Sequence, residues 1–155
     1  NNDYDKALKG DGKHVGLIAV SEDYSSTKHG KLASFYVGRI YLEQGKFQQA
    51  IDYLEKFSPK DKFLASQSKA LVGDAYWELN QLDNAIKYYE EASKIKPNNF
   101  TTPAILMKLG AAYEVKGNNQ KALDCYNLIK TDYPRSVEFQ SIEKYISRME
   151  TLLGK

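Results

Sequence analysis

The chain of 155 residues has little of what marks several large classes of protein. Its one cysteine, Cys125, excludes a disulfide within the chain. No apolar run approaches the roughly 18 residues of a membrane-spanning helix. The net charge is only +2, and no basic block suggests nucleic-acid binding. Four prolines and the lack of alternating apolar and polar residues favour helices over sheet.

The sequence also lacks a constellation of catalytic or metal-binding residues. The two histidines, His14 and His29, do not occur in an HxxxH or HExxH spacing. The glycine pair at 10–12 lacks the lysine of a phosphate loop, so we interpret it as a turn into a helix, with Asp11 as a possible cap. Cys125 is expected to be a packed small residue rather than a nucleophile. We therefore expect no enzyme activity, no cofactor and no metal.

What the sequence does contain is a repeated pattern with constant internal spacing. Three sets combine a glycine, a tyrosine three residues later and an alanine nine residues after that: Gly38, Tyr41 and Ala50; Gly73, Tyr76 and Ala85; Gly110, Tyr113 and Ala122. The glycines are 35 and 37 residues apart, and a large apolar or aromatic residue follows each alanine after four positions. A repeat of this length is typical of a stacked array of helices.

The pattern has a physical reason at each position. The tyrosine lies one turn beyond its glycine, on the same helix face. The glycine costs a helix up to ~1 kcal/mol against alanine, which is acceptable where a second helix must approach closely. The expected breaks within the helix pairs are Gly45, Asn80 and Gly117, each as a left-handed cap. Pro97 and Pro134 would follow second helices, and Thr102-Pro103 reads as the N-cap and first residue of the next helix.

The repeated glycine, tyrosine and alanine positions resemble the tetratricopeptide repeat, a 34-residue helix–turn–helix unit. The second repeat matches best, with "LVGDAY", "AIKYYEEA" and Pro97, whereas the first carries Lys62 in place of the proline. The early tryptophan of the family is absent. The resemblance implies an all-α solenoid of antiparallel helix pairs in a right-handed superhelix. We expect repeats at 31–62, 66–99 and 103–134, a linker and degenerate half-repeat with a helix over 17–24 in residues 1–30, and a capping helix within 136–155.

The resemblance also implies a binding surface. In this family the first helices form a concave groove, and the variable positions on them contact the partner. The corresponding residues are Tyr36, Arg39, Glu43, Asp74, Trp77, Glu78, Met107, Lys108 and Glu114. Trp77 stands out, because an aromatic residue among charges is typical of a binding hot spot. The alternative is that Trp77 packs against the next repeat and that Arg39 pairs with Asp74.

One subtype of the family is not expected. Its members bind an acidic chaperone tail through a clamp of lysines, asparagines and an arginine. The matching positions are Phe35, Arg39, Leu71, Ala104 and Lys108. Because only Lys108 approximates a basic clamp residue, an acidic chaperone C-terminus is not the expected partner.

The resemblance implies a non-catalytic scaffold that binds a protein or peptide segment and no nucleic acid. The alternative is an accessory or oligomerisation domain of a larger cell-envelope assembly. The stretches "YDKALKGDG" and "GKLASFYVG" also resemble membrane-anchored bacterial tetratricopeptide proteins of the cell envelope, including those beside the Sec translocon. That resemblance implies an anchor before Asn1 and a position on the periplasmic or cell-envelope side of a membrane; otherwise the chain is expected in the cytoplasm.

Overall fold

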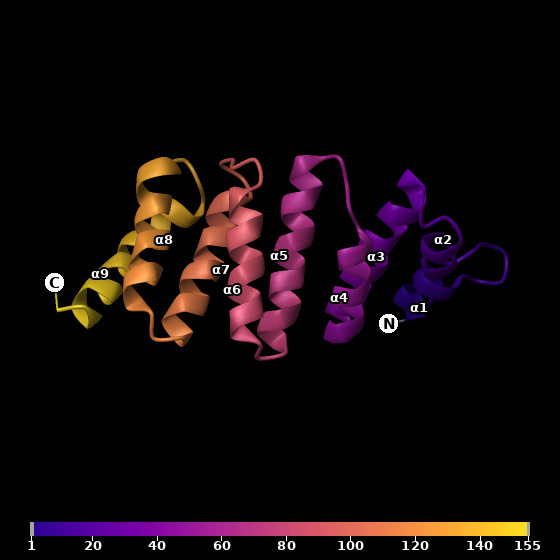
Figure 1. Ribbon diagram of the computed structural model, residues 1–155, viewed down its shortest axis with the longest axis horizontal. Coiled ribbons are helices and arrows are strands. Elements are labelled where there is room, and N and C mark those ends of the chain that lie inside the picture. The colour runs from indigo at the N-terminus through magenta and orange to yellow at the C-terminus, as the bar shows by residue number, and fades with distance from the viewer. Residues whose placement is uncertain (1, 155) are drawn as a thin grey trace.

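The computed structural model describes residues 2–154, and this part of the chain contains helices and no strand. Its elements are α1 (Asn2–Lys9), α2 (Leu17–Asp23), α3 (Lys28–Glu43), α4 (Phe47–Lys56), α5 (Lys62–Glu78), α6 (Leu82–Lys94), α7 (Thr102–Val115), α8 (Asn119–Asp132), a 3-10 turn (Glu138–Ser141) and α9 (Ile142–Leu152) (Figure 1). The prediction of an all-helical fold is confirmed for these residues.

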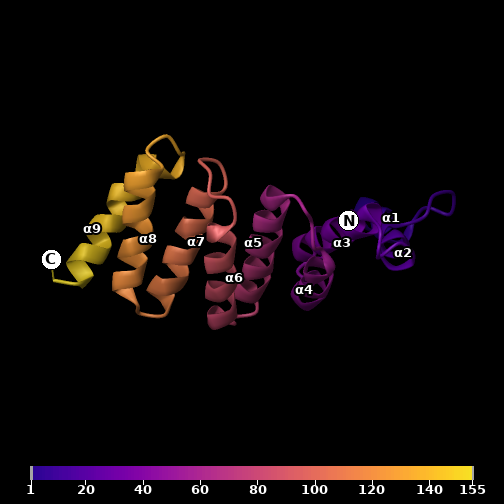
Figure 2. The same cartoon turned by 45° about the horizontal axis from the view of Figure 1, so that its top comes forward.

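The helices form a single row. Each helix packs mainly against its neighbours in the chain, and the most extensive contacts join α3 with α4, α5 with α6, and α7 with α8. The N-terminal helices α1 and α2 and the C-terminal helix α9 therefore lie at opposite ends of an elongated solenoid (Figures 1 and 2). This arrangement matches the expected stack of antiparallel helix pairs.

The glycine columns lie where the helices of each pair approach most closely. A Cβ atom on Gly73 would lie 2.6 Å from Cε1 of Tyr89, and one on Gly38 would lie 2.6 Å from Cγ of Leu54. Gly110 has the same relation to Tyr126. The alanines of the pattern are fully buried at the same crossings. The prediction that small residues permit close packing is therefore confirmed.

The turns within the three pairs also follow the prediction. Gly45, Asn80 and Gly117 have φ angles of +71°, +57° and +73°. The amide of the residue after each of them donates a hydrogen bond to the carbonyl of a pattern tyrosine: Lys46 to Tyr41, Gln81 to Tyr76 and Asn118 to Tyr113. This is the Schellman pattern of a left-handed helix C-cap.

Two apolar clusters run along the solenoid. The N-terminal core extends from Leu8 of α1 to Ala75 of α5, and the C-terminal core extends from Ala70 of α5 to Met149 of α9. Helix α5 contributes to both, and the half-buried Tyr76 contacts both. Tyr76 is less buried than Tyr41 and Tyr113, the tyrosines at the same position of the other two repeats.

The N-terminal segment differs from the expectation of a linker. Residues Asn2–Lys9 form α1, whose Leu8 is buried in the N-terminal core. Asp11 does not cap the following helix, because its carboxylate accepts hydrogen bonds from the amides of Lys13 and His14. Helix α2 begins only at Leu17, so Asp11 stabilises the preceding turn instead.

Two helix starts are also displaced from their expected positions. Helix α7 begins at Thr102, which makes Thr101 the N-cap, and the Thr102 hydroxyl accepts a hydrogen bond from the amide of Asn98. The expected C-terminal helix is divided into a 3-10 turn and α9, and α9 begins at Ile142.

Candidate partner-binding groove

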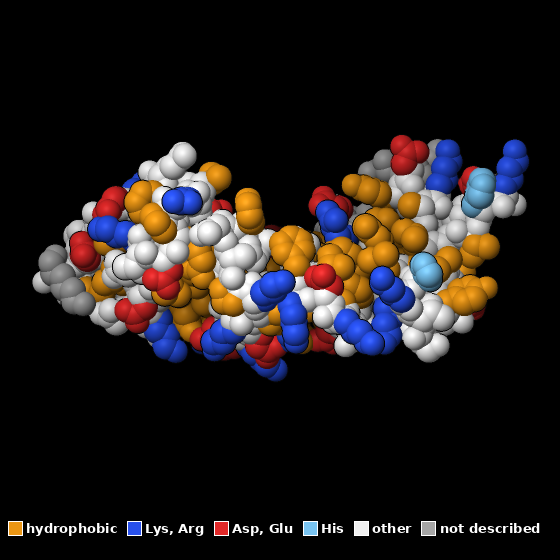
Figure 3. Space-filling model, turned by 90° about the horizontal axis from the view of Figure 1, so that it is seen from above, with side chains coloured by type: hydrophobic (Ala, Val, Ile, Leu, Met, Phe, Trp, Pro, Cys, Tyr) orange, Lys and Arg blue, Asp and Glu red, His pale blue; other side chains and the backbone are white. Residues whose placement is uncertain are grey.

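The helices α3, α5 and α7 border a hollow on the concave side of the solenoid. It has a volume of about 610 Å³ and includes residues of α6 and of the turn before α4. We call it the Trp77 hollow; it is lined by Leu42, Glu43, Gly45, Phe47, Asp74, Trp77, Glu78, Tyr89, Lys108 and Ala111. Figure 3 shows the molecule hollowed along one side, between its N-terminal and C-terminal arms.

Trp77 combines two environments. Its side chain is half-buried and packs against the C-terminal core. The same side chain lines the Trp77 hollow. The indole thus has one supported surface and one accessible surface, which is the arrangement of a rigid aromatic residue available for contact.

Asp74 connects three helices at the floor of this hollow. Its carboxylate accepts hydrogen bonds from Nζ of Lys108 at 2.7 and 2.8 Å and from the hydroxyl of Tyr89 at 2.8 Å. Arg39 does not pair with Asp74, in contrast to the alternative considered from the sequence. Its guanidinium carbon instead lies 5.9 Å from the ring centroid of Phe35. The network holds α5, α6 and α7 in one arrangement.

Burial strengthens the preference of the tyrosine in this network for its protonated form. It raises the pKa of the Tyr89 hydroxyl above its usual range, and the neighbouring Asp74 carboxylate raises this pKa further. Tyr89 therefore remains a hydrogen-bond donor at neutral pH. The hollow as a whole has an acidic excess, with Glu43, Asp74 and Glu78 against Lys108.

A second hollow continues from the first. It has a volume of about 350 Å³, and its lining includes Arg39, Leu71 and Phe100. Asp74 and Lys108 line both hollows, so together the two make one surface, which we call the concave groove. Phe100 is 88% exposed, which is unusual for a phenylalanine and marks the rim of this surface.

The structure brings together six of the nine residues predicted for the groove. Those lining it are Arg39, Glu43, Asp74, Trp77, Glu78 and Lys108. Tyr36 is exposed and packs edge-on against the ring of its neighbour Phe35. Met107 packs against the C-terminal core. Glu114 accepts hydrogen bonds from Arg148 Nη2, both at 2.6 Å, and from the Tyr126 hydroxyl, so its carboxylate is already engaged.

Several groove residues were missed from the sequence. Leu42 occupies the column of Trp77 in the first repeat, so the repeat alignment could have identified it. Phe47 and Tyr89 reach the hollow from second-helix positions. Phe100 lies in the loop before α7, where the repeat pattern carries no signal for a binding residue.

Other features bear on catalysis and on membranes. Between residues 2 and 154, no three histidine, cysteine or acidic side chains lie close enough to hold a metal ion. Within the same residues, no helix combines the length and apolar character needed to cross a membrane. Burial raises the pKa of the Cys125 thiol to about 12, so it is protonated at neutral pH.

Comparisons with known proteins agree with this architecture. Tetratricopeptide repeat models match residues 66–99, 32–58 and 104–136, which together exceed half of the chain. The uncharacterized protein ycf37 of Guillardia theta is 29% identical over 121 residues, which cover 75% of this chain and 66% of that protein. The chain thus spans just under two thirds of the length of that relative.

Solved structures share the fold. One crystal structure of MamA superposes with a TM-score of 0.71 at 21% identity, covering 97% of this chain and 83% of that one. A second MamA structure has a TM-score of 0.74 at 21% identity, covering 99% and 75%. The repeat models and the helix pairs agree, and the chain belongs to the tetratricopeptide repeat family.

Proposed function

We propose that the chain is a non-catalytic scaffold that holds a segment of a partner protein in the concave groove. The observation that carries this proposal is the position of Trp77, half-buried against the core and lining the groove. Tryptophan is enriched among residues that dominate binding energy, because it offers a large and rigid surface. Tetratricopeptide repeat proteins are generally such scaffolds, in accord with this proposal.

The charges of the groove indicate which segments fit it. The Asp74 carboxylate is already satisfied by Lys108 and Tyr89, so a partner can cover it without leaving a buried charge unpaired. Glu43 and Glu78 are exposed beside Trp77 and retain their acidic character. A segment with an apolar anchor for the indole and a neighbouring lysine or arginine complements this surface.

Site-specific photo-crosslinking tests the groove. A photoreactive residue at position 78, next to Trp77, should capture a partner, whereas one at the exposed position 87 of α6 should not. The additional substitution Trp77→Ala should reduce capture at position 78 without reducing the amount of folded protein. Equal capture at both positions would count against the groove as the binding surface.

The alternative function, assembly into a larger complex, is favoured by exposed apolar residues outside the concave groove. Phe63 and Val137 are 42% and 78% exposed, and neither lines the groove. Sedimentation velocity distinguishes the two functions. A monomer supports the scaffold, and a dimer that Val137→Ser dissociates supports assembly.

The proposed place of action rests on sequence resemblance alone. The stretches similar to the envelope proteins support a position beside a membrane with an anchor before Asn1. Fractionation of cells that express the natural gene tests this proposal. Recovery of all of the protein in the soluble cytoplasmic fraction would refute it.

A further inference from the structure

A second cavity lies outside the concave groove, at the edge where the first two helix pairs meet. It has a volume of about 650 Å³, within the usual range of ligand pockets. It is bordered by the start of α3, the end of α4, the loop from α4 to α5 and the first turn of α5. We call it the basic pocket, and the residues that characterise it are Lys28, Lys31, Leu32, Phe57, Lys60 and Leu64.

The basic pocket has a cationic rim. Three lysines line it against one acidic residue, Asp61. The Asp61 carboxylate accepts hydrogen bonds from the amides of Phe63 and Leu64 and so caps α5. Among the described residues, Lys28, Lys31 and Lys60 have no hydrogen bond, ion pair or aromatic contact with another side chain.

The excess of positive side chains in this pocket is larger than in the other hollows described above, and the second hollow of the concave groove has Arg39 and Lys108 against Asp74. The Trp77 hollow has three acidic residues against one lysine. A hollow between α6, α7 and α8, which includes Cys125, has three acidic residues against two lysines. Since the whole chain carries a net charge of only +2, the basic pocket concentrates positive charge locally. An anionic ligand is the electrostatic complement of such a site.

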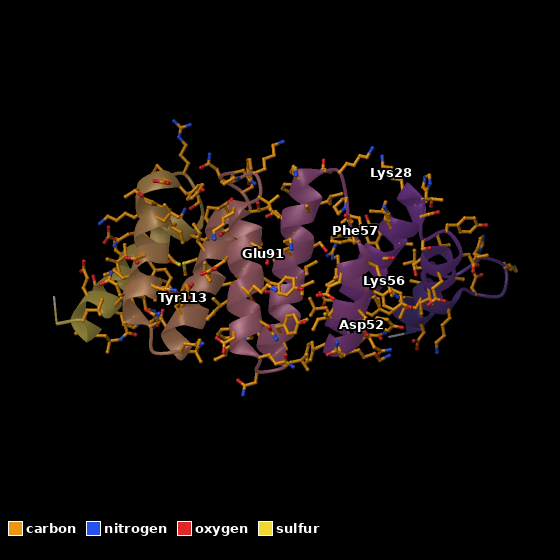
Figure 4. All side chains as sticks on the ribbon, in the orientation of Figure 1. Lys28, Asp52, Lys56, Phe57, Glu91 and Tyr113 are labelled. Carbon is orange, nitrogen blue, oxygen red and sulfur yellow. The ribbon has the colours of Figure 1, made fainter. Side chains whose placement is uncertain are left out.

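The floor of the pocket is apolar. Phe57 is 8% exposed and belongs to the N-terminal core, and Leu32 and Leu64 are half-buried and pack against that core. Figure 4 labels Lys28 at the start of α3 and Phe57 beside α4, and both residues line the pocket. The ligand should therefore carry an apolar group that contacts the floor of the pocket. Negative charges on either side of this group would face the lysines of the rim.

A single entering side chain fits better than a membrane surface. None of the apolar residues that line the pocket is exposed, so none of them could insert into a bilayer. An apolar group must instead enter the cavity from the partner. We propose that the basic pocket binds an acidic segment of a partner protein, in which aspartate or glutamate flanks a large apolar side chain. This site is separate from the concave groove and acts independently of it.

Fluorescence anisotropy with a defined probe tests this proposal. The probe is a fluorescein-labelled peptide, Asp-Asp-Leu-Phe-Asp-Asp, with blocked ends. It should bind the full chain, and more weakly as salt is raised from 50 to 300 mM, as expected for exposed charges. The peptides Lys-Lys-Leu-Phe-Lys-Lys and Asp-Asp-Ser-Ser-Asp-Asp should each bind at least tenfold more weakly. Equal binding of all three peptides would overturn the proposal.

Paired charge reversals locate the binding. Lys28→Glu/Lys60→Glu should weaken binding of the probe at least tenfold. Lys13→Glu/Lys144→Glu makes the same change in net charge at exposed positions away from the pocket and should weaken it less than threefold. Equal losses of affinity in both double variants would show that binding depends only on net charge. This result would overturn the proposed site. Trp77→Ala should leave probe binding within twofold, so failure of the concave groove would not be mistaken for failure of this pocket.

A measurement without substitutions guards against misfolded variants. Addition of the probe should shift backbone amide resonances within residues 28–32 and 57–64. Shifts confined to 42–47 and 74–78 would place the probe in the Trp77 hollow and overturn the proposal. Binding to phosphatidylglycerol vesicles without binding to the peptide would assign the lysines to a membrane surface and would also overturn it.

Discussion

At the scale of single residues, the three pattern glycines determine how closely the helices of each pair approach. Gly73 is buried, and the ring of Tyr89 occupies the space that a side chain at position 73 would need. Gly38 and Gly110 have the same relation to Leu54 and Tyr126. The cost of glycine in a helix is offset by this packing.

The substitution Gly73→Leu should destabilise the fold. Forcing extra methylenes into a packed interior typically costs ~1–3 kcal/mol. Glu78→Ala, at an exposed position of the same helix, should change the free energy of unfolding by less than ~0.5 kcal/mol. Urea unfolding measures both values. Equal midpoints for the two variants would show that the close crossing does not depend on Gly73.

Tyrosine hydroxyls that are partly buried should make the stability sensitive to alkaline pH. Burial, followed by a hydrogen bond to Glu22, raises the pKa of Tyr53 to about 12, and burial also raises the pKa of Tyr126. An unfolded tyrosine ionises near pH 10. Because folding raises the pKa of these tyrosines, their contribution to stability is fully present below about pH 10. This contribution is lost as the pH rises from about 10 to 12.

Thermal unfolding between pH 8 and 11 tests this dependence. The melting temperature should fall above pH 10, together with the appearance of tyrosinate absorbance. Lysines also titrate in this range, so Tyr126→Phe is the control, and it should reduce the dependence on pH. The same slope in both proteins would assign the effect to groups other than Tyr126.

At the scale of helices, polar side chains connect successive repeats. Asp74 of α5 pairs with Lys108 of α7, and Glu114 of α7 pairs with Arg148 of α9. In both pairs the two residues are 34 positions apart. These pairs join α5 to α7 and α7 to α9, in addition to the packing of the cores.

Removing Asp74 should destabilise the fold more than removing Lys108, its partner in the ion pair. Asp74→Ala leaves the buried Tyr89 hydroxyl without its acceptor, which should cost ~1–3 kcal/mol. Lys108→Ala removes an exposed ion pair, which is typically worth ~0–1 kcal/mol. Urea unfolding of the two variants measures the difference. Equal costs would mean that the hydrogen bond from Tyr89 adds nothing to stability.

The helices inside the repeats could be predicted from the sequence, because each has a glycine, tyrosine or alanine at a constant position. Helix α1 could not, since its eight residues contain only Tyr4 and Leu8 as large apolar side chains. The start of α7 was displaced by one residue, because Thr101 and Thr102 are both plausible caps and the structure uses Thr102 to bind the amide of Asn98.

The groove was predicted less completely than the fold. Trp77 and Asp74, which were selected from variable positions on the first helices, line the same hollow. Glu114 also lies at a variable position of a first helix, but its carboxylate accepts hydrogen bonds from Arg148. Such pairing depends on side-chain conformations that a repeat pattern does not encode. The lysines of the basic pocket come from a helix start and a loop, where the repeat has no constant position.

At the scale of the whole molecule, the single row of helices produces a long surface. The two cores are joined through α5, which also carries Asp74, Trp77 and Glu78 to the middle of the groove. In such arrays stability comes from contacts between neighbouring repeats, and the surface remains available for a partner. The basic pocket lies on another edge, so two segments of a partner could be bound at once.

The central claim is that Trp77 anchors a partner in the groove, and the affinity of Trp77→Ala for the partner captured at position 78 tests it most directly. Calorimetric titration should show binding weakened by ~2 kcal/mol or more, about thirtyfold. Because the indole is only half-buried, the loss of stability should remain below the ~3–5 kcal/mol of a fully buried aromatic residue. Unchanged affinity in a variant that is folded under the assay conditions would contradict the account.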